Sequence, residues 1–538
     1  MDVAGAFNYV YHKRLIYNMK KRRVSNFIVR WMENFLQGRS TKLRFNGWES
    51  ETIRTDAGVP QGSPISPVLY MFYNADLLDI PGHMSGRLSL GFIDDIAYGI
   101  QGQTAEKNAR ELETMLNKAE IWRERHGARF ETSKYVLVHF IKTRNASDTP
   151  ASQIHIGDIT IKPANEAKYL GVLFDPKLSF QQHIQHAAKK GTQFALAISR
   201  IPNCTRGPAY QQTRTLFTAV VAPRMDYAAI IWYKPPKGTS PPPRWTSLAK
   251  LETAQRTAMK AILGTFRTTP SLAMQIETSL PPTHLRLKNK ALQSWIRMQT
   301  VPETHPINAA IQRAIVSRSM ATTTPLEHLA RMFPNHAAPI ETIKPHPVPP
   351  WWSPPFHVEI NCDKKMAKAK HDSTLHDGNT LCIYTDGSGI NGHVGAAAVC
   401  PKTSQMLQRY LGSDKEHNIY SAEVTAFELA AEIALTSPPS YTKCLIYADS
   451  QAAILGIHNP NKQSGQTLII SAIGKIQALA DTRNITTEIK WVPGHIDISG
   501  NEEADKAAKT AAKSEGKDPH IPRTNFKPLK LARSVTIK

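Results

Sequence analysis

Residues 381–389 read Leu-Cys-Ile-Tyr-Thr-Asp-Gly-Ser-Gly, an apolar run followed by one acid and two glycines. The apolar part predicts a buried strand, and the glycines predict a turn directly after Asp386. A second apolar run over residues 444–448 ends in the same way, at Asp449. We therefore expect a sheet that carries both acids at the ends of its strands.

Two further acids lie on predicted helices. Glu423 opens the helical segment 421–430, and Asp505 ends the stretch Gly-Asn-Glu-Glu-Ala-Asp of the last helix. Each acid alone is typical of a turn or a surface. Four carboxylates that converge would repel one another unless cations held them, and hard oxygen ligands suit Mg²⁺ or Mn²⁺. Two such ions about 3.5–4 Å apart activate a water and stabilise the leaving oxygen in phosphodiester cleavage.

Five short motifs in the last quarter of the chain resemble the type 1 ribonuclease H family, in the family's order. They are Tyr-Thr-Asp386-Gly-Ser, Ala-Glu423, Tyr-Ala-Asp449-Ser, Trp491-Val-Pro-Gly-His495 and Asn501-Glu-Glu-Ala-Asp505. The resemblance implies that the four acids hold two Mg²⁺ (or Mn²⁺) ions and cut the RNA strand of RNA–DNA hybrids. It also implies that His495 assists turnover, although a lone histidine is more often structural.

The composition is strongly basic. Sixty-six Lys and Arg against 44 Asp and Glu give a net charge of +22 over 538 residues. Such an excess predicts a polyanionic partner, most simply nucleic acid. A membrane surface also attracts positive charge, but no apolar run approaches the ~20 residues that span a bilayer, and the first residues show no secretory signal.

The five cysteines show no Cys-x-x-Cys spacing, which predicts reduced thiols in an intracellular protein rather than a zinc site or a disulfide framework. They are Cys204, Cys362, Cys382, Cys400 and Cys444. On this basis we expect the protein in the nucleus, the cytoplasm or both.

Three features mark the N-terminal region. Asp2 begins a short apolar stretch, and residues 56–67 form a Gly/Pro-punctuated loop before an apolar helical run, 68–78. In residues 91–98, Asp94 and Asp95 stand between two short apolar runs, as in a two-residue hairpin turn. An Asp-Asp pair in a hairpin is by itself usually a solvated turn.

Together these features resemble motifs A, B and C of reverse transcriptases, most of all those of non-LTR (LINE-like) retrotransposons. An amphipathic helix at 104–126, Ser133-Lys134 and a primer-grip-like Tyr169-Leu-Gly-Val172 follow in the family's order. The resemblance implies an RNA template and a DNA primer as partners, with two-metal attack by a primer 3′-oxygen. It implies that Asp2 and Asp94 are metal ligands and that Asp95 is a neighbouring acid. Phe7 would exclude a 2′-hydroxyl, and Gln61 and Gly62 would line the template–nucleotide pocket. Asn8, where many relatives have Asp, is not expected to be a ligand.

The family places a fingers region before motif A, whereas this sequence begins within the strand that bears Asp2. A ligand near a terminus is poorly supported, and catalysis tolerates little misplacement. We therefore expect a truncated polymerase region that is inactive unless another polypeptide supplies the fingers. Two alternatives stay open: a fully active reverse transcriptase with ribonuclease H, and a non-catalytic nucleic-acid-binding relic.

The expected fold is multidomain, α/β and α+β, with a mixed sheet and flanking helices at the C-terminal end. The predicted divisions are a partial reverse transcriptase palm (1–179), a helical thumb and connection (180–332), a Pro-rich linker (333–378), a ribonuclease H domain (379–514) and a basic tail (515–538). Predicted strands of the ribonuclease H domain are 381–386, 395–400, 405–411, 443–449 and 487–492. Two short stretches each have two possible interpretations. Lys20–Arg23 is either a nuclear signal or RNA contact, or a solvated helix face. Trp351-Trp352 either stacks on bases or docks on a neighbouring domain.

Overall fold

The computed structural model describes the chain except residues 83, 142–151, 201–207, 235–245, 318–323, 333–339, 362, 375–377, 495–496, 515–523, 525–528 and 530–538. It divides into two compact units, Met1–Ala187 and Ala188–Lys538. Among the described helices, none is long and apolar enough to cross a bilayer. Most of the predicted tail lies outside the described residues, as do the Pro-rich stretch 235–243, Cys204, Cys362 and His495.

Among its described residues, the first unit contains four α-helices and the start of a fifth, one 3₁₀ turn and five small two-stranded sheets. Its elements are α1 (His12–Lys21), α2 (Asn26–Leu36), β1 (Ser40–Thr41), β2 (Arg44–Phe45), β3 (Trp48–Glu49), β4 (Ile53–Arg54), α3 (Ser66–Leu78), β5 (Arg87–Phe92), β6 (Asp95–Ile100), α4 (Ala105–His126), η1 (Thr132–Lys134), β7 (Ile154–Ile156), β8 (Ile159–Ile161), β9 (Ala167–Tyr169) and β10 (Val172–Phe174).

Helices α1 to α4 pack around one apolar core, in which Tyr70 and Tyr73 of α3 are fully buried. The expected amphipathic helix is confirmed as α4. Its first turn is capped by the side chain of Thr104, which accepts from the N–H of Lys107, and it ends at Gly127 in the left-handed conformation that glycine tolerates best.

The hairpin of β5 and β6 differs by one residue from the predicted turn. Phe92 pairs with Asp95, so the turn consists of Ile93 and Asp94, and Asp95 already belongs to β6. Ile93 adopts a positive φ of 57°, which is unfavourable for a β-branched residue. Such outliers persist where the surrounding structure enforces them, often at functional sites.

The second unit begins with helices, as the apolar periodicity of residues 180–332 predicts. They are α5 (Gln181–Ser199, which starts in the first unit), α6 (Tyr210–Leu216), the π-helix η3 (Phe217–Val221), α7 (Ala222–Met225), α8 (Ala229–Trp232), α9 (Thr246–Leu263), α10 (Ser271–Thr278), α11 (Thr283–Gln299), α12 (Ile307–Val316) and α13 (Pro325–Met332).

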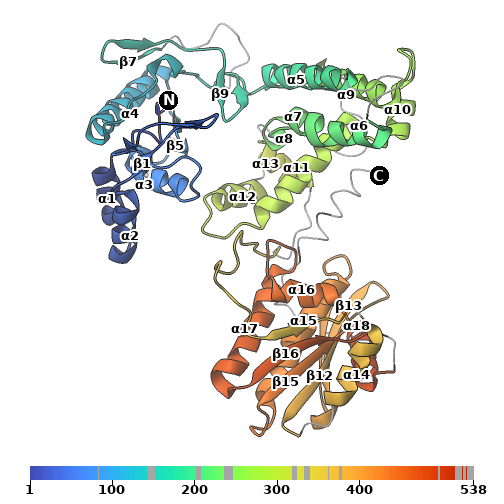
Figure 1. Cartoon of the computed structure of the whole chain (residues 1–538). Coiled ribbons are helices and arrows are strands. Elements are labelled where there is room, and N and C mark those ends of the chain that lie inside the picture. Colours follow the sequence, from blue (N-terminus) through green and yellow to red (C-terminus); the bar gives the residue numbers. More distant parts are fainter. Residues whose placement is uncertain are drawn as a thin grey trace. The chain divides into compact units, whose positions relative to one another are not determined.

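A six-stranded mixed sheet with flanking helices forms the C-terminal part (Figure 1). Its order is β11-β16-β15-β12-β13-β14, with β11, β16, β15 and β12 parallel and the hairpins β12–β13 and β13–β14 antiparallel. The elements are β11 (His357–Glu359), α14 (Lys364–Thr374), β12 (Thr380–Ile390), β13 (His393–Cys400), η4 (Pro401–Thr403), β14 (Gln405–Ser413), α15 (Ile419–Thr436), β15 (Lys443–Ala448), α16 (Gln451–His458), α17 (Gln466–Arg483), β16 (Thr486–Trp491) and α18 (Ser499–Lys513).

The central strands β12 and β15 are buried on both faces, which is why they read as continuous apolar runs. Leu381 and Ile383 of β12 enter the core beneath α15, α16 and α17, whereas Cys382 and Tyr384 enter the core on the α18 side. The five predicted strands are therefore confirmed, with ends that differ by up to four residues.

Part of the predicted linker belongs to this sheet. Residues 357–359 form β11, which pairs in parallel with β16 and occupies that edge. Helix α14 follows, and the ring of His371 packs against Tyr384 and Tyr447, with centroids 5.7 and 4.9 Å away. Trp352 packs against the core of the sheet, so the docking alternative holds for this residue, whereas Trp351 is exposed. The boundary at residue 379 stays a prediction.

Candidate active site

Adjacent parallel strands bring Asp386 and Asp449 together. Thr385 of β12 pairs with Ala448, the last residue of β15, so the next residues along the two strands are the two acids. The turn expected after Asp386 is wrong: β12 continues to Ile390, and Asp386 faces Ala397 of β13 in mid-strand. The pairing with β13 therefore holds the backbone of this acid within a continuous strand.

Glu423 reaches the same place from α15. The side chain of Asn418 caps this helix by accepting from the N–H of Ser421 at 2.9 Å, which leaves Glu423 in the second turn rather than at the helix start. The helix crosses β12 very closely, because a Cβ added to Gly387 would lie 2.5 Å from the backbone nitrogen of Glu423. Only glycine allows this approach.

The three carboxylates form one tight group. Single oxygen atoms of Asp386, Glu423 and Asp449 all lie within 4.8 Å of one another, and within the described ranges no other set of three or more His, Cys, Asp or Glu side chains does so. Burial, followed by the charges of Asp449 and Asp505, raises the pKa of Asp386 to about 7. Burial and the charges of Asp386 and Asp449 raise the pKa of Glu423. The backbone N–H of Gly387 donates to both carboxyl groups and opposes these shifts.

Asp505 of α18 stands at the margin of this group. It is not one of the three acids within 4.8 Å, yet its charge raises the pKa of Asp386. Its carboxylate pairs with Lys509 one turn later on α18, with Nζ 2.6 Å from Oδ2. The structure thus brings three of the four predicted acids into contact range and holds the fourth in an ion pair nearby.

The last motif frames Asp449. The indole Nε1 of Trp491 donates to the carbonyl of Asp449 at 2.9 Å, which fixes the backbone where β15 ends. A Cβ on Gly494 would lie 2.8 Å from Asp449 Oδ2, so the backbone of Gly494 lies directly against this acid. His495, the next residue, lies outside the described residues.

The donor set fits a hard divalent cation. All three groups are carboxylates, the oxygen ligands that Mg²⁺ and Mn²⁺ prefer. Burial and then the charges of the neighbouring acids raise the pKa of Asp386 to about 7, so a cation bound between the carboxylates would offset both effects. Asp386, Glu423 and Asp449 are therefore a candidate metal site.

The acids of the first unit are arranged more loosely. Asp2 forms an isolated antiparallel bridge with Asp95, and the N–H of Val3 donates to the carbonyl of Asp94 at 3.1 Å. Burial and the charges of Asp94 and Asp2 raise the pKa of Asp95. The structure thus gathers the three predicted residues, although their oxygens do not form a group as tight as that of Asp386.

The expectation that Asp2 is poorly supported is wrong for its backbone. Residues 2–4 bond to both neighbouring segments: on one side to Asp94 and Asp95, and on the other through Glu131 N–H to Asp2 carbonyl (3.0 Å) and Ala4 N–H to Arg129 carbonyl (2.8 Å). The Asp2 carboxylate also pairs with Lys134, whose pKa this contact raises. Lys134 lies in a 3₁₀ turn, not at the start of a strand.

The predicted nucleotide pocket residues gather beside these acids. Phe7 packs on the fully buried Tyr70, with ring centroids 5.5 Å apart. Val59 N–H donates to the carbonyl of Phe7 at 2.7 Å, which ties the 56–67 loop to the segment after Asp2. Gln61 Nε2 donates to Asn8 Oδ1 at 3.2 Å, and the exposed Gly62 adopts a φ of 90°.

Three residues at these sites carry no sequence signal strong enough to predict them. Lys509 follows Asp505 by four residues on a helix, a spacing that favours an ion pair but is common on solvated faces. Asn418 is one of many polar residues before an apolar run. Tyr70 looks like an ordinary core residue, although burial and then the charge of Asp94 raise its pKa.

Two family models match the chain. The model of reverse transcriptase (RNA-dependent DNA polymerase) matches residues 1–174, and the RNase H model matches residues 378–513. A probable RNA-directed DNA polymerase from transposon X-element of Drosophila melanogaster is 27% identical over 238 residues, 43% of this chain and 25% of that protein. The RNA-directed DNA polymerase from mobile element jockey of Drosophila funebris is 22% identical over 325 residues, 59% of this chain and 34% of that protein. The chain thus spans about a quarter to a third of these relatives.

Solved structures match the C-terminal part. The N-terminal RNase H domain of Rv2228c from Mycobacterium tuberculosis, solved as a fusion with maltose-binding protein, is 20% identical, with a TM-score of 0.20, over 25% of this chain and 94% of that chain. LC11-RNase H1 in complex with an RNA/DNA hybrid is 18% identical, with a TM-score of 0.20, over 24% of this chain and 96% of that chain. With its reverse transcriptase region and its C-terminal RNase H domain, the chain is a relative of the RNA-directed DNA polymerases of LINE-like, non-LTR retrotransposons.

Proposed function

We propose that the chain hydrolyses the RNA strand of RNA–DNA hybrids at the site of Asp386, Glu423, Asp449 and Asp505, with two divalent ions. The observation that carries this proposal is the group of three carboxylate oxygens within 4.8 Å, on a region that matches the RNase H family. Bound Mg²⁺ or Mn²⁺ would supply an activated water and would stabilise the charge on the leaving oxygen.

The residues of the chain position this chemistry. Asp386 and Asp449 offer oxygens from neighbouring strand positions, and Glu423 closes the group from α15. Asp505 joins them when its ion pair with Lys509 opens. His495, the residue after Gly494 in the sequence, is proposed to assist turnover. The cleavage would leave a 3′-hydroxyl and a 5′-phosphate.

The substrate preference follows from the shape of the hybrid. An RNA-containing duplex is recognised through its groove geometry and its 2′-hydroxyls more than through base edges. We therefore propose cleavage with little sequence preference, on hybrids in the nucleus, the cytoplasm or both.

Cleavage of a labelled RNA–DNA hybrid by the purified chain tests this function. We expect cutting in Mg²⁺, none in EDTA, and a loss of about 100-fold or more in Asp449→Asn, since changes one shell further out already cost 10–100-fold in metal sites. Asp481→Asn is the matched control, because this acid is exposed on α17. Salt-sensitive hybrid binding without cutting in Mg²⁺ would instead support the non-catalytic relic.

A second function, RNA-directed DNA synthesis, is favoured by the bridge that brings Asp2 to Asp95 in a region matching reverse transcriptases. Primer extension on an RNA template tests it, with Asp94→Asn as the control. Extension that the variant abolishes would support a working polymerase. Failure to extend would leave hybrid cleavage as the function of the chain.

A further inference from the structure

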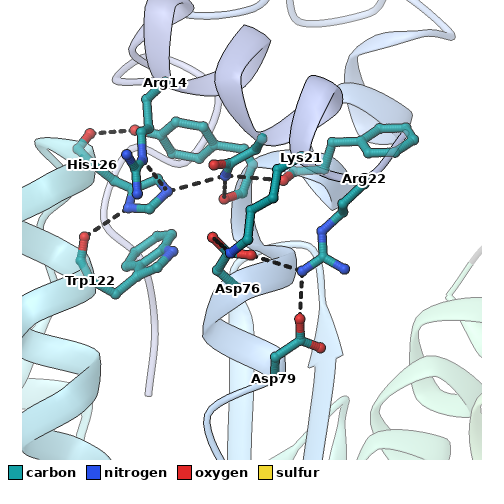
Figure 2. Close-up of polar contacts among 10 residues, drawn as sticks. Arg14, Lys21, Arg22, Asp76, Asp79, Trp122 and His126 are labelled. Atoms are coloured by element: carbon teal, nitrogen blue, oxygen red, sulfur yellow. Dashed lines mark hydrogen bonds and ion pairs between the residues drawn. The ribbon is translucent and has the colours of Figure 1, made fainter. Parts of the chain in front are cut away.

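A pocket of about 370 Å³ opens on the first unit between α1, the end of α3 and α4. This volume lies within the usual range of small-ligand sites, roughly 300–1,000 Å³. Its lining includes Arg14, Lys118, Trp122 and Arg125, and Figure 2 shows the side chains of Arg14 and Trp122 beside the acids of α3. None of the predicted catalytic or nucleotide-pocket residues lines it.

The acids in this pocket are already neutralised. Asp76 pairs with Lys21 at 3.0 Å and with Arg22 at 2.9 Å, and Asp79 pairs with Arg22 at 2.6 Å (Figure 2). These pairs lower the pKa of Asp76, so it stays ionised and occupied by its own cations. The acids therefore leave the remaining positive charges of the pocket uncompensated.

Three cations in the lining have no such partner. Within the part of the chain that the structure describes, no carboxylate lies in ion-pair distance of Arg14, Lys118 or Arg125. Lys118 and Arg125 are seven residues apart on α4, so they project from one face of the helix, with Trp122 between them. Arg14 faces this helix from α1, with Nε 3.4 Å from Nε2 of His126.

The lining of the pocket includes two packed rings, those of Trp122 and His126, and a buried donor. The indole of Trp122 is 5% exposed and stacks on His126 with centroids 4.4 Å apart, yet its Nε1 has no acceptor among the described residues. Burial lowers the pKa of His126 to about 4, so this ring is neutral. His126 Nδ1 donates to the carbonyl of Trp122 at 2.9 Å, and its Nε2 faces Asn18 Nδ2 at 3.2 Å. Both ring nitrogens of His126 therefore already have hydrogen-bond partners within the protein.

What remains for a ligand is a set of donors only: three cationic side chains and one indole N–H. A group that accepts several hydrogen bonds and carries negative charge satisfies such a set. Arginine and lysine are the usual phosphate-binding side chains. The net charge of +22 agrees with a polyanion as the source of this group.

We propose that this pocket binds a backbone phosphate of nucleic acid, as a contact separate from the acids of both candidate active sites. It holds a strand on the α1–α3–α4 face of the first unit and adds affinity without base specificity. The proposal does not depend on hybrid cleavage, because every lining residue belongs to the first unit.

Binding of a fluorescent 20-nucleotide single-stranded RNA in EDTA tests the pocket. The variant is Lys118→Gln/Arg125→Gln, because both side chains are exposed and their loss spares the core. The control is Lys107→Gln/Arg110→Gln, which removes the same charge from exposed positions elsewhere on α4. We expect about a tenfold loss of affinity and a salt slope smaller by roughly 1 to 2 in the variant, and less than about a twofold loss in the control.

Three further arms locate the ligand. Trp122→Phe replaces the indole by a smaller aromatic ring without the N–H, and should weaken binding in the same direction by a smaller factor. The same titration with DNA and with RNA–DNA hybrid distinguishes which backbone the pocket holds. Equal losses in the variant and the control would show a general positive surface, and displacement of RNA by poly-glutamate at equal charge would show a carboxylate ligand. Either result, or unchanged binding in the variant, would overturn the proposal.

Discussion

The two carboxylate sites of this chain differ in how their scaffolds hold them. Asp386 and Asp449 stand on central strands that are buried on both faces, and Glu423 is pressed against them by a glycine contact. Asp94 stands in a two-residue turn, and Asp2 is paired with the cation of Lys134. The comparison teaches that the first arrangement buries its acids together and so raises the pKa values of Asp386 and Glu423, whereas the second leaves the Asp2 carboxylate in an ion pair with Lys134.

The largest expected contrast is catalytic. Asp386→Asn should lower hybrid cleavage by about 10²–10³-fold, because electrostatic groups aimed at a developing charge contribute effects of this size. Asp94→Asn should leave hybrid cleavage unchanged, since its turn belongs to the other unit. Initial rates on one labelled hybrid measure both variants. Equal losses would mean that the two sites act as one.

The next contrast is between Gly387, beside the acids of the RNase H domain, and Gly62, in the 56–67 loop. Gly387→Ala places a Cβ 2.5 Å from the backbone of Glu423, so α15 must move, and we expect a loss of about 3 kcal/mol in the free energy of unfolding. Gly62→Ala meets no atom within 4 Å and should cost only about 1 kcal/mol, from its φ of 90°.

Denaturant unfolding with and without Mg²⁺ measures this second contrast. We expect Mg²⁺ to shift the transition of the RNase H domain, because the group of Asp386, Glu423 and Asp449 would bind the ion only in the folded state. A tolerated Gly387→Ala would show that the close helix–strand contact is not required to gather the acids.

A third contrast is the pH dependence of stability without metal. The folded pKa of Asp386 is raised to about 7, above its unfolded value near 3.9. Between these values the folded state holds a proton that the unfolded state has lost, so stability is present at low pH and is lost as pH rises toward 7. We expect a Tm higher at pH 5 than at pH 8 by roughly 4 °C or more.

Asp386→Asn should flatten this pH profile, and Mg²⁺ should restore more stability at pH 8 than at pH 5, because protons then no longer compete. Asp94→Asn is the comparison in the first unit. The pKa of the neighbouring Asp95 is also raised, as is that of Asp386, but Asp95 is more exposed. A Tm in EDTA that rises from pH 5 to pH 8 would contradict the assignment.

The smallest contrast concerns the lysines beside each site. Lys509→Gln frees Asp505, and we expect the Mg²⁺ concentration for half-maximal cleavage to fall roughly two- to threefold, the size of an exposed ion pair. Lys134→Gln should leave this value unchanged, because its partner is Asp2. A Mg²⁺ titration of hybrid cleavage measures both. A higher Mg²⁺ requirement in Lys509→Gln would mean that the pair orients Asp505 for binding.

The sequence predicts the parts of the fold that are buried on both sides. Strands β12 and β15 can be predicted because every residue of an apolar run is buried. Their parallel register then brings Asp386, in the middle of β12, next to Asp449 at the end of β15. Strand β11 cannot be predicted from the sequence, since its three residues are too few to show a periodicity and their pairing partner is more than 120 residues away. The one-residue shift at Ile93 has the same origin: the hairpin register depends on tertiary contacts that local turn rules do not contain.

The edge strand β11 also has a consequence for solubility. The RNase H family match begins at residue 378, which follows β11 and α14 in the sequence. A fragment cut at that boundary would leave β16 with an open row of N–H and carbonyl groups, which recruits strands from other molecules. In the intact chain, β11 pairs with β16 and therefore protects this edge of the sheet from aggregation.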